Sequence, residues 1–294
     1  MMQSLRHIVF FCLTTLLFFV PLAAVGGEFD LGVEIEKAGK GEAESQYAVG
    51  RAYFRGEGVP KDLVKAAEFF RKAADQKHTK AQANLGSMYI QGQGVAADPV
   101  EAMRLFKEAA KANDPVALTN LGWMYSSGLG TDKNMEQSLG YYRRAAEAGN
   151  VTAQVRLGDY LLKGTDGVAK DFAEAARWFR LAAAQGSAAA QNSLGVMCEN
   201  GLGTEKDIAL AVTWFRLAAE RGEARAQLNL GRMYDEGTGV KADPVEACKW
   251  LALSANQAEV SGQKYLIDIL ENGRVTREQL AEGSKLAGEF VAKP

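Results

Sequence analysis

Few side chains in this sequence could carry acid–base, metal or nucleophilic chemistry. After residue 26 the chain has a single histidine, His78, and two cysteines, Cys198 and Cys248. A zinc site needs about four converging ligands, and a catalytic triad needs a histidine beside its nucleophile. The sequence also lacks a G-x-S-x-G string, a phosphate-binding loop and an H-E-x-x-H string. We therefore expect no metal, no cofactor and no enzymatic activity.

One short string could support a nucleophile. Ser261 and Lys264 match S-x-x-K, the acylating motif of penicillin-recognising enzymes. However, the S-A-N string at 254–256 comes before it, the reverse of the usual order, and no K-T-G follows. A chance match is therefore the favoured interpretation. A β-lactam-binding or β-lactam-hydrolysing protein that uses these two residues is the alternative.

Composition and charge exclude one class of partner. The 294-residue chain is 47% hydrophobic and 24% charged, which is ordinary for a folded protein. Its 34 basic and 36 acidic residues leave a net charge of −2, without any block of like charges. Nucleic-acid binding depends on a basic surface that meets the phosphate backbone, so we expect no nucleic-acid partner.

The N-terminal residues 1–26 have the pattern of a secretory signal peptide. Arg6 precedes an apolar run over residues 8–20, and small residues would allow cleavage after Ala24 or Gly26. The run is short for a bilayer span, which favours cleavage over a retained membrane anchor. We expect a periplasmic or secreted mature protein without stable membrane insertion.

The three cysteines are compatible with export but leave two interpretations open for Cys198 and Cys248. Cys12 lies inside the apolar run, without the small residues that a lipoprotein cleavage site needs, so no lipid anchor is expected. Removing residues 1–26 takes away one arginine and no acidic residue, which changes the net charge from −2 to −2 − 1 = −3. In an oxidising compartment Cys198 and Cys248 could form a disulfide, or they could be two buried small side chains.

A glycine recurs along the rest of the chain at a nearly constant interval. The successive intervals are 36, 36, 36, 37 and 36 residues, and the extra residue lies in the G-T-D-G string at 164–167. A period of this length predicts tandem helical hairpins that bury their apolar faces against their neighbours. The recurring glycines are Gly50, Gly86, Gly122, Gly158, Gly195 and Gly231.

Each copy of the repeat predicts two helices. In the first, small and apolar residues around the glycine share one helical face, and a G-x-G string typical of a left-handed C-cap follows. Four residues later comes a side chain that can cap a second helix. The second helix carries a bulky pair, such as Leu105-Phe106, and then a small pair, such as Ala109-Ala110. The predicted caps are Asp62, Asp98, Asn134, Asp171, Asp207 and Asp243.

The end of each copy also needs a left-handed residue. Gly149, Gly186 and Gly222 provide it in three copies, and Asn113, the next-best residue, provides it in another. Lys77 stands at the same point and breaks the pattern.

The pattern A-x-x-x-L-G-x-x-Y-x-x-G-x-G, an Asx cap and A-x-x-x-F-x-x-A-A-x-x-G resembles the Sel-1-like repeat (SLR) family, a relative of the tetratricopeptide repeats. The resemblance implies an all-α fold: a right-handed α/α superhelical solenoid of about six 36-residue hairpins with capping helices. It also implies a scaffold for protein complexes. Some bacterial members are described as penicillin-binding, and others as inhibitors, host-interaction factors or periplasmic assembly factors, so the family does not name a partner.

The repeat phase predicts the organisation of the whole chain. A signal peptide over 1–26 precedes a partial leading repeat over 27–44. C-terminal capping helices occupy 259–294, and they include a helix from about Arg274 to Phe290 with Thr276 near its acidic first turn. The six repeats are predicted at 45–80, 81–116, 117–152, 153–189, 190–225 and 226–258.

In related α/α solenoids the first helix of each repeat lines the concave surface. We therefore predict partner-binding residues at the two first-helix positions on either side of the Leu-Gly pair. The position before the pair holds Asn84, Asn120, Arg156 and Asn229, and the position after it holds Arg51, Trp123, Asp159 and Arg232. This mixture of charges favours a protein or peptide partner over a polyanion.

Two alternatives stay open for these residues. An asparagine could bind the backbone of a peptide, or it could bond to a neighbouring helix end. Trp123 could anchor a partner, or it could pack between repeats. With these alternatives in view, the sequence predicts an exported, monomeric, non-enzymatic scaffold or adaptor that acts in regulation or complex assembly at the cell envelope.

Overall fold

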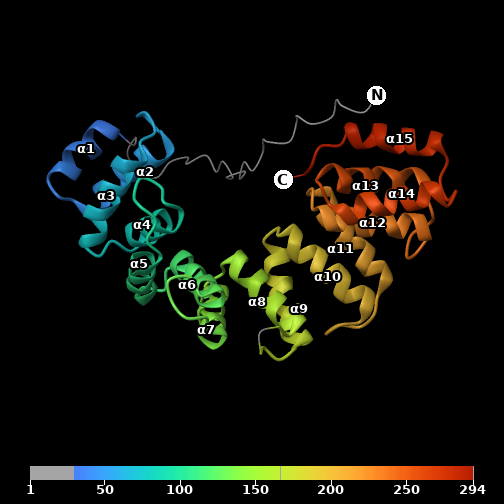
Figure 1. The fold of residues 1–294 in the computed structure, drawn as a ribbon, viewed down its shortest axis with the longest axis horizontal. Helices are drawn as coiled ribbons and strands as arrows, with labels where there is room; N and C mark the ends of the chain where they lie inside the picture. The colour runs from blue at the N-terminus through green and yellow to red at the C-terminus, as the bar shows by residue number, and fades with distance from the viewer. Residues whose placement is uncertain (1–29, 166, 294) are drawn as a thin grey trace, which may run out of the picture.

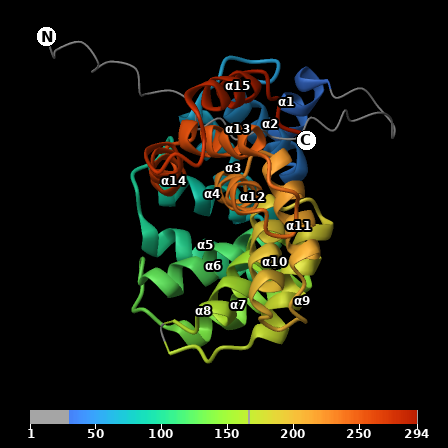
Figure 2. The ribbon, with the colours of Figure 1, turned by 90° about the vertical axis from the view of Figure 1, so that its right-hand side faces the viewer.

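The computed structural model describes residues 30–165 and 167–293, which form fifteen helices and no strand. These helices follow one another around an open arc (Figure 1). In the view of Figure 2 both ends of the arc lie at the top, and α8 and α9 lie at the bottom. The predicted all-α solenoid is therefore confirmed. The predicted signal peptide and Cys12 lie outside the described residues.

Helices alternate along the arc as first and second members of the hairpins. The leading helix α1 (Leu31–Gly39) precedes the repeats, and α14 (Val260–Glu271) and α15 (Arg277–Gly288) follow them. The first helices are α2 (Ala43–Arg55), α4 (Thr79–Gln91), α6 (Pro115–Ser127), α8 (Val151–Lys163), α10 (Ala188–Asn200) and α12 (Ala224–Glu236). The second helices are α3 (Leu63–Asp75), α5 (Pro99–Lys111), α7 (Met135–Glu147), α9 (Phe172–Ala184), α11 (Ile208–Glu220) and α13 (Pro244–Asn256).

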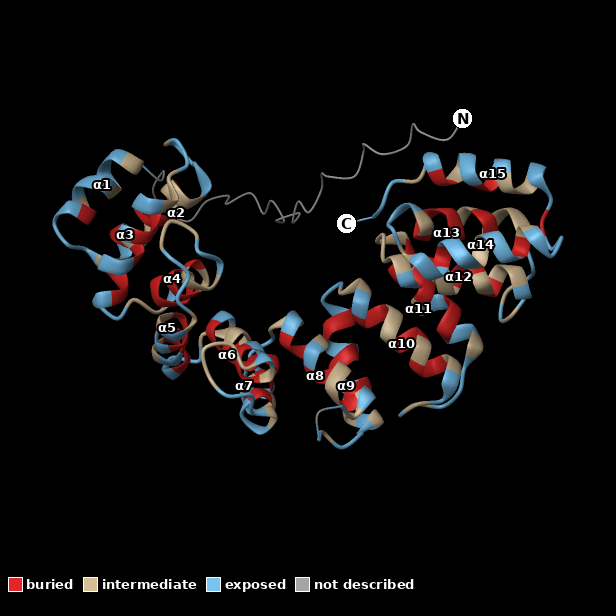
Figure 3. Ribbon diagram, viewed as in Figure 1, coloured by how far each residue is buried: buried red, intermediate tan, exposed pale blue. Residues whose placement is uncertain are grey.

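The recurring glycine is the point where the two helices of a hairpin meet. A Cβ atom on Gly122 would lie 2.8 Å from the ring of Tyr142, closer than two carbon atoms normally approach. The other five glycines face Phe70, Phe106, Phe179, Phe215 and Leu251 in the same way. Figure 3 shows buried residues on the paired helices all along the arc. The period of the sequence is thus the period of the core.

The predicted caps of the second helices are all present. In each, the Asp or Asn side chain accepts a hydrogen bond from a backbone N–H in the first turn, as Asp98 does from Val100 and Glu101 at 3.0 Å. The left-handed turns between repeats are also present. Lys77 has φ 63° and Asn113 has φ 55°. Neighbouring contacts therefore hold Lys77 in a conformation that costs a non-glycine residue about 1 kcal/mol.

A buried glutamine joins most repeats to the preceding one. The side-chain amides of Gln82, Gln154, Gln191 and Gln227 donate to carbonyls eight residues earlier, at 3.4, 3.1, 3.4 and 3.2 Å. These carbonyls belong to the last turn of the previous second helix, which cannot bond them itself. The third repeat has the buried Leu118 at this position. Its junction with the second repeat is apolar at that point.

The array ends because the next hairpin cannot close. Ile267 in α14 lies 36 residues after Gly231, so a branched side chain occupies the place of the packing glycine. Helix α15 packs against α13 instead of α14. Gly283 makes this possible, since a Cβ atom on it would lie 2.5 Å from that of Cys248. Thr276 and Gln279 form a capping box at the start of α15.

The two described cysteines are buried and unbonded. Burial raises the pKa of both thiols, that of Cys248 to about 11. The thiolate is the reactive form of cysteine, so both side chains act as small apolar groups in the core.

Candidate protein-binding face

The first helices form the inner side of the arc over its N-terminal half. Figure 1 shows α2, α4 and α6 toward the hollow, with α3, α5 and α7 outside them. On each first helix, the Leu-Gly pair or its Val-Gly equivalent is buried in the core, and the residues that flank this pair are half-buried or exposed. We call the surface made by these flanking positions the inner face. All eight residues predicted to bind a partner lie on it.

Helix α6 exposes an apolar stripe in the middle of the inner face. Val116, Asn120 and Trp123 lie four and three residues apart, which places them in line on one side of the helix. Val116 is 45% exposed and Trp123 is 39% exposed. The Asn120 amide donates to the Val116 carbonyl at 3.0 Å, so it is held within its own helix. These three residues are the central stripe.

Arg156 and Asp159 lie on α8, the next first helix. Arg156 is exposed and makes no hydrogen bond or ion pair within the described part of the chain. Asp159 is half-buried, and this burial raises the pKa of its carboxyl. Asn84 on α4 is also half-buried and makes no side-chain hydrogen bond to the described residues. The residues beside the central stripe therefore keep polar groups for other partners.

The C-terminal part of the inner face is bonded to itself. The Asn229 amide donates to the Asn192 side chain at 3.0 Å. Arg232 donates to Glu199 of the preceding first helix at 2.5 Å and to Glu236 at 3.0 Å. These pairs join α10 to α12 across the surface. Asn229 and Arg232 are thus engaged within the chain.

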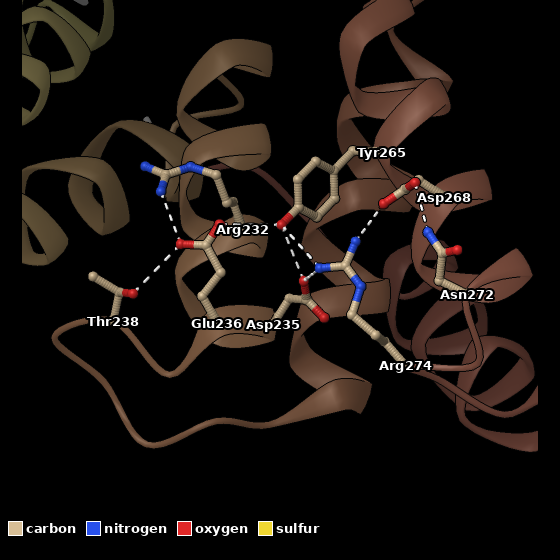
Figure 4. Close-up of polar contacts among 8 residues, drawn as sticks. All are labelled: Arg232, Asp235, Glu236, Thr238, Tyr265, Asp268, Asn272 and Arg274. Carbon is tan, nitrogen blue, oxygen red and sulfur yellow. Dashed lines mark hydrogen bonds and ion pairs between the residues drawn. The ribbon is translucent and has the colours of Figure 1, made fainter.

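The same bonding continues into the C-terminal cap (Figure 4). Arg274 is paired with Asp235 of α12 and with Asp268 of α14. The Tyr265 hydroxyl donates to Asp235 at 3.0 Å, and burial raises the pKa of Tyr265 to about 12. We call these four residues, together with Arg232, Glu199 and Glu236, the C-terminal network. It ties the last repeat to α14.

At the other end of the face, Arg51 lies over an aromatic ring. Its guanidinium carbon is 5.8 Å from the centre of the Tyr47 ring, within cation–π range. Tyr47 also stacks on His78, with ring centres 4.6 Å apart. Arg51 therefore packs within the first repeat. It lies on α2, two repeats before Trp123 on α6.

No chemistry is assembled around Ser261 and Lys264. Both are exposed on α14 and are not bonded to each other in the described structure. Ser254 is buried, and its hydroxyl donates to the Ala224 carbonyl at 2.8 Å, which is a structural role. Residues 30–165 and 167–293 also contain no group of three His, Cys, Asp or Glu side chains that could hold a metal ion. The arrangement gives no support to the β-lactam alternative.

The sequence did not predict the exposure of Val116 or the ion pairs of Glu199 and Arg274. Val116 lies one turn before Asn120, and its exposure was the missing part of the stripe. Glu199 and Arg274 hold the C-terminal network together. The signal for Val116 was available, since a valine seven residues before a tryptophan shares its helical side.

The fold and this face define a class of protein: an α/α solenoid repeat protein whose surface suits contacts with other macromolecules. The chain belongs to the Sel1 repeat family. The family model, Sel1 repeat, matches residues 43–78, 79–114, 115–150, 151–187, 188–223 and 224–259. Proteins of this family generally mediate protein–protein interactions.

Two solved structures have a similar overall fold. A Sel1 repeat protein from Oxalobacter formigenes is 31% identical with a TM-score of 0.66, over 76% of this chain and 94% of that one. A protective antigen with an SLR fold from uropathogenic Escherichia coli is 30% identical with a TM-score of 0.60. That alignment covers 88% of this chain but only 63% of the antigen. No curated protein matches the sequence.

Proposed function

We propose that this chain is an exported, non-enzymatic scaffold or adaptor that binds another protein on its inner face, with the central stripe as the main contact. The observation that carries the proposal is the exposure of Trp123. A large amphipathic ring turned to solvent loses apolar hydration when a partner covers it, and such residues dominate interface energetics. Arg156 on the next first helix, α8, makes no hydrogen bond or ion pair with a described residue, so its charge can give orientation to the contact.

The rest of the inner face supports this location. Asn229 and Arg232 are bonded to neighbouring repeats, so a partner would have to break these bonds to use them. Contact with Trp123 and Arg156 breaks no bond that the described residues make. The proposed site is therefore centred on α6 and α8, and Asn229, Arg232 and Arg51 lie outside it.

Site-specific crosslinking in the native host tests the proposal. A photoreactive amino acid would replace Val116 on the central stripe and, as the matched control, Val100 on α5, which is 66% exposed. We expect a discrete protein adduct from position 116 and none from position 100. Equal adducts from both positions, or none from position 116, would contradict a binding site on the inner face.

Export is a separate part of the proposal with its own test. It is supported by the basic, apolar and small-residue pattern of residues 1–26. Cell fractionation followed by N-terminal sequencing should find a mature chain that begins near residue 25 or 27 outside the cytoplasm. A full-length chain in the cytoplasm would refute export without affecting the binding site.

A further inference from the structure

A second apolar surface lies on the second helices of the fourth and fifth repeats. On α11, Leu210, Trp214 and Leu217 lie four and three residues apart and so share one side of the helix. Leu210 and Leu217 are exposed, and Trp214 is half-buried. Leu181 on α9 is 45% exposed, one repeat before Leu217. We call these four residues the α9–α11 patch.

The equivalent side of α13 is covered by the chain itself. Trp250 and Leu253 lie 36 residues after Trp214 and Leu217, and Leu253 is 9% exposed against 36% for Leu217. Phe290 contacts Trp250 edge to face, with ring centres 5.6 Å apart. Ala287 of α15 belongs to the same hydrophobic cluster. A helix with small residues and a following aromatic thus buries this side of a second helix.

The residues after α15 lie next to the end of α11, which carries part of the α9–α11 patch. The Lys293 backbone N–H donates to the Glu220 carbonyl at the end of α11 at 2.7 Å, and its ammonium group bonds the Glu220 carboxylate at 2.6 Å. The interface that α15 and its tail make with α13 therefore reaches the border of the α9–α11 patch. The patch continues that interface onto the preceding repeat.

The patch also lacks a group that its neighbours have. The indole N–H of Trp178 donates to Glu174 at 3.2 Å, and that of Trp250 donates to Glu246 at 2.8 Å. Leu210 stands where these glutamates stand, so Trp214 has no carboxylate one turn before it in α11. No described residue accepts a hydrogen bond from its indole nitrogen. An occupant that brings a carboxylate would complete this contact.

The charges near the patch favour the same occupant. Arg177 and Arg180 on α9 are exposed, and neither forms an ion pair with a described residue. Arg177 lies over the Trp178 ring at 4.5 Å, one turn before Leu181. Arginines that form no ion pair with the described residues and lie near an apolar surface are complementary to an acidic amphipathic segment. In the chain's own covering segment, Glu289 stands directly before Phe290.

We propose that the α9–α11 patch binds a helix of a partner protein that presents small residues and an aromatic side chain next to a carboxylate, as α15 and its tail do on α13. This surface differs from the central stripe, so the chain joins two partners or two parts of one partner. The inference does not depend on the inner-face proposal, because no residue is shared between the two surfaces.

A peptide with the chain's own residues 277–293 is the probe. It is labelled with a fluorophore and titrated with the purified chain and with two variants, Leu217→Glu and the matched control Val64→Glu on α3. We expect binding to the wild type and the control, and at least a tenfold weaker Kd for Leu217→Glu. A peptide with Phe290→Ala or Glu289→Gln should also bind more weakly.

Four results would overturn the proposal. The wild-type chain would fail to bind the peptide, Leu217→Glu would bind it unchanged, or Val64→Glu would lose it equally. In the fourth, light scattering would find a wild-type dimer that Leu217→Glu dissociates, which would make a second copy the occupant. If Leu217→Glu lowers the melting temperature, Leu181→Glu replaces it, since that side chain is also exposed.

Discussion

The central stripe and the C-terminal network use equivalent positions of the repeat in different ways. Asn120 and Asn229 both stand before the Leu-Gly pair, and Trp123 and Arg232 both stand after it. On α12 these positions bond to α10 through Asn229 and Arg232. On α6 they leave Trp123 exposed to solvent.

The difference comes from the helix that precedes each one. Helix α10 supplies Asn192 and Glu199, whose oxygens accept from α12. At the same repeat positions α4 has Ala83 and Ile90, which have no polar side-chain atoms. A position on the inner face therefore holds two repeats together or stays open to a partner, depending on a side chain 33 or 37 residues earlier.

The first prediction tests whether the hairpins under the central stripe and under the C-terminal network both depend on the packing of their recurring glycine. Gly122→Leu places a branched side chain against the ring of Tyr142, so we expect the free energy of unfolding to fall by about 3 kcal/mol. Gly231→Leu, facing Leu251, should have a similar effect at the C-terminal end. Urea denaturation followed by circular dichroism measures both.

Gly140 on α7 provides the control for this experiment. It lies within a helix and is exposed, and a Cβ atom on it would meet nothing within 4 Å. Gly140→Ala should therefore raise stability by up to about 1 kcal/mol through helix propensity. If Gly122→Leu left the midpoint unchanged, the glycine would not be the packing point of the hairpin.

These glycines illustrate what the sequence predicted well. Glycine columns, Asx caps and left-handed turns are local signals, and each repeats in phase, so the helices and their pairing followed from the spacing alone. The sequence also predicted that Trp123 points away from the Leu-Gly core, and its side chain is exposed there. It could not decide between an anchor and a packing residue, because that depends on which neighbours reach the ring.

The signals that were missed depend on pairs far apart in the chain. Arg232 and Glu199 are 33 residues apart, and Arg274 and Asp235 are 39 apart. Their contact follows only once the helices are stacked. The docking of α15 on α13 was missed for a different reason. Ile267, 36 residues after Gly231, already indicated that α14 cannot close a seventh hairpin.

The second prediction concerns a variant that disrupts the C-terminal network. Arg232→Ala leaves Glu199 partly buried without its charge partner, and we expect a loss of about 2 kcal/mol in the free energy of unfolding. Capture of the inner-face partner should be unchanged. A variant of normal stability that no longer binds would instead place Arg232 in the binding site.

The third prediction is the reverse case on the central stripe. Asn120→Ala combined with Trp123→Ala removes no bond to another helix that the described residues make, so the free energy of unfolding should change by less than about 0.5 kcal/mol. Affinity for the partner should fall by about 2 kcal/mol, or roughly 30-fold. Binding would be measured by calorimetry with the crosslinked partner. A large loss of melting temperature would assign Trp123 to the core.

The fourth prediction has the smallest effect and concerns pH. Burial raises the pKa of Asp159, so the folded chain holds this proton more tightly than the unfolded chain does. Protonated Asp159 makes its full contribution to stability when the pH is below the pKa of this carboxyl in the unfolded chain. That contribution is lost as the pH rises through its pKa in the folded chain. At about pH 7 the ionised carboxylate is therefore destabilising, and Asp159→Asn should be more stable than the wild type.

The matched variant at the other end of the face should behave in the opposite way. Asp235 is buried and paired with Arg274, so Asp235→Asn removes a satisfied charge and should lower stability at about pH 7. Urea midpoints at several pH values measure both variants, and the gain from Asp159→Asn should shrink toward acid pH. The half-buried carboxylate of Asp159 forms no hydrogen bond or ion pair with a described residue, and its burial outweighs the attraction of the nearby cations, so it lowers the stability of the free chain. A partner that donates a hydrogen bond to Asp159 would remove that penalty on binding.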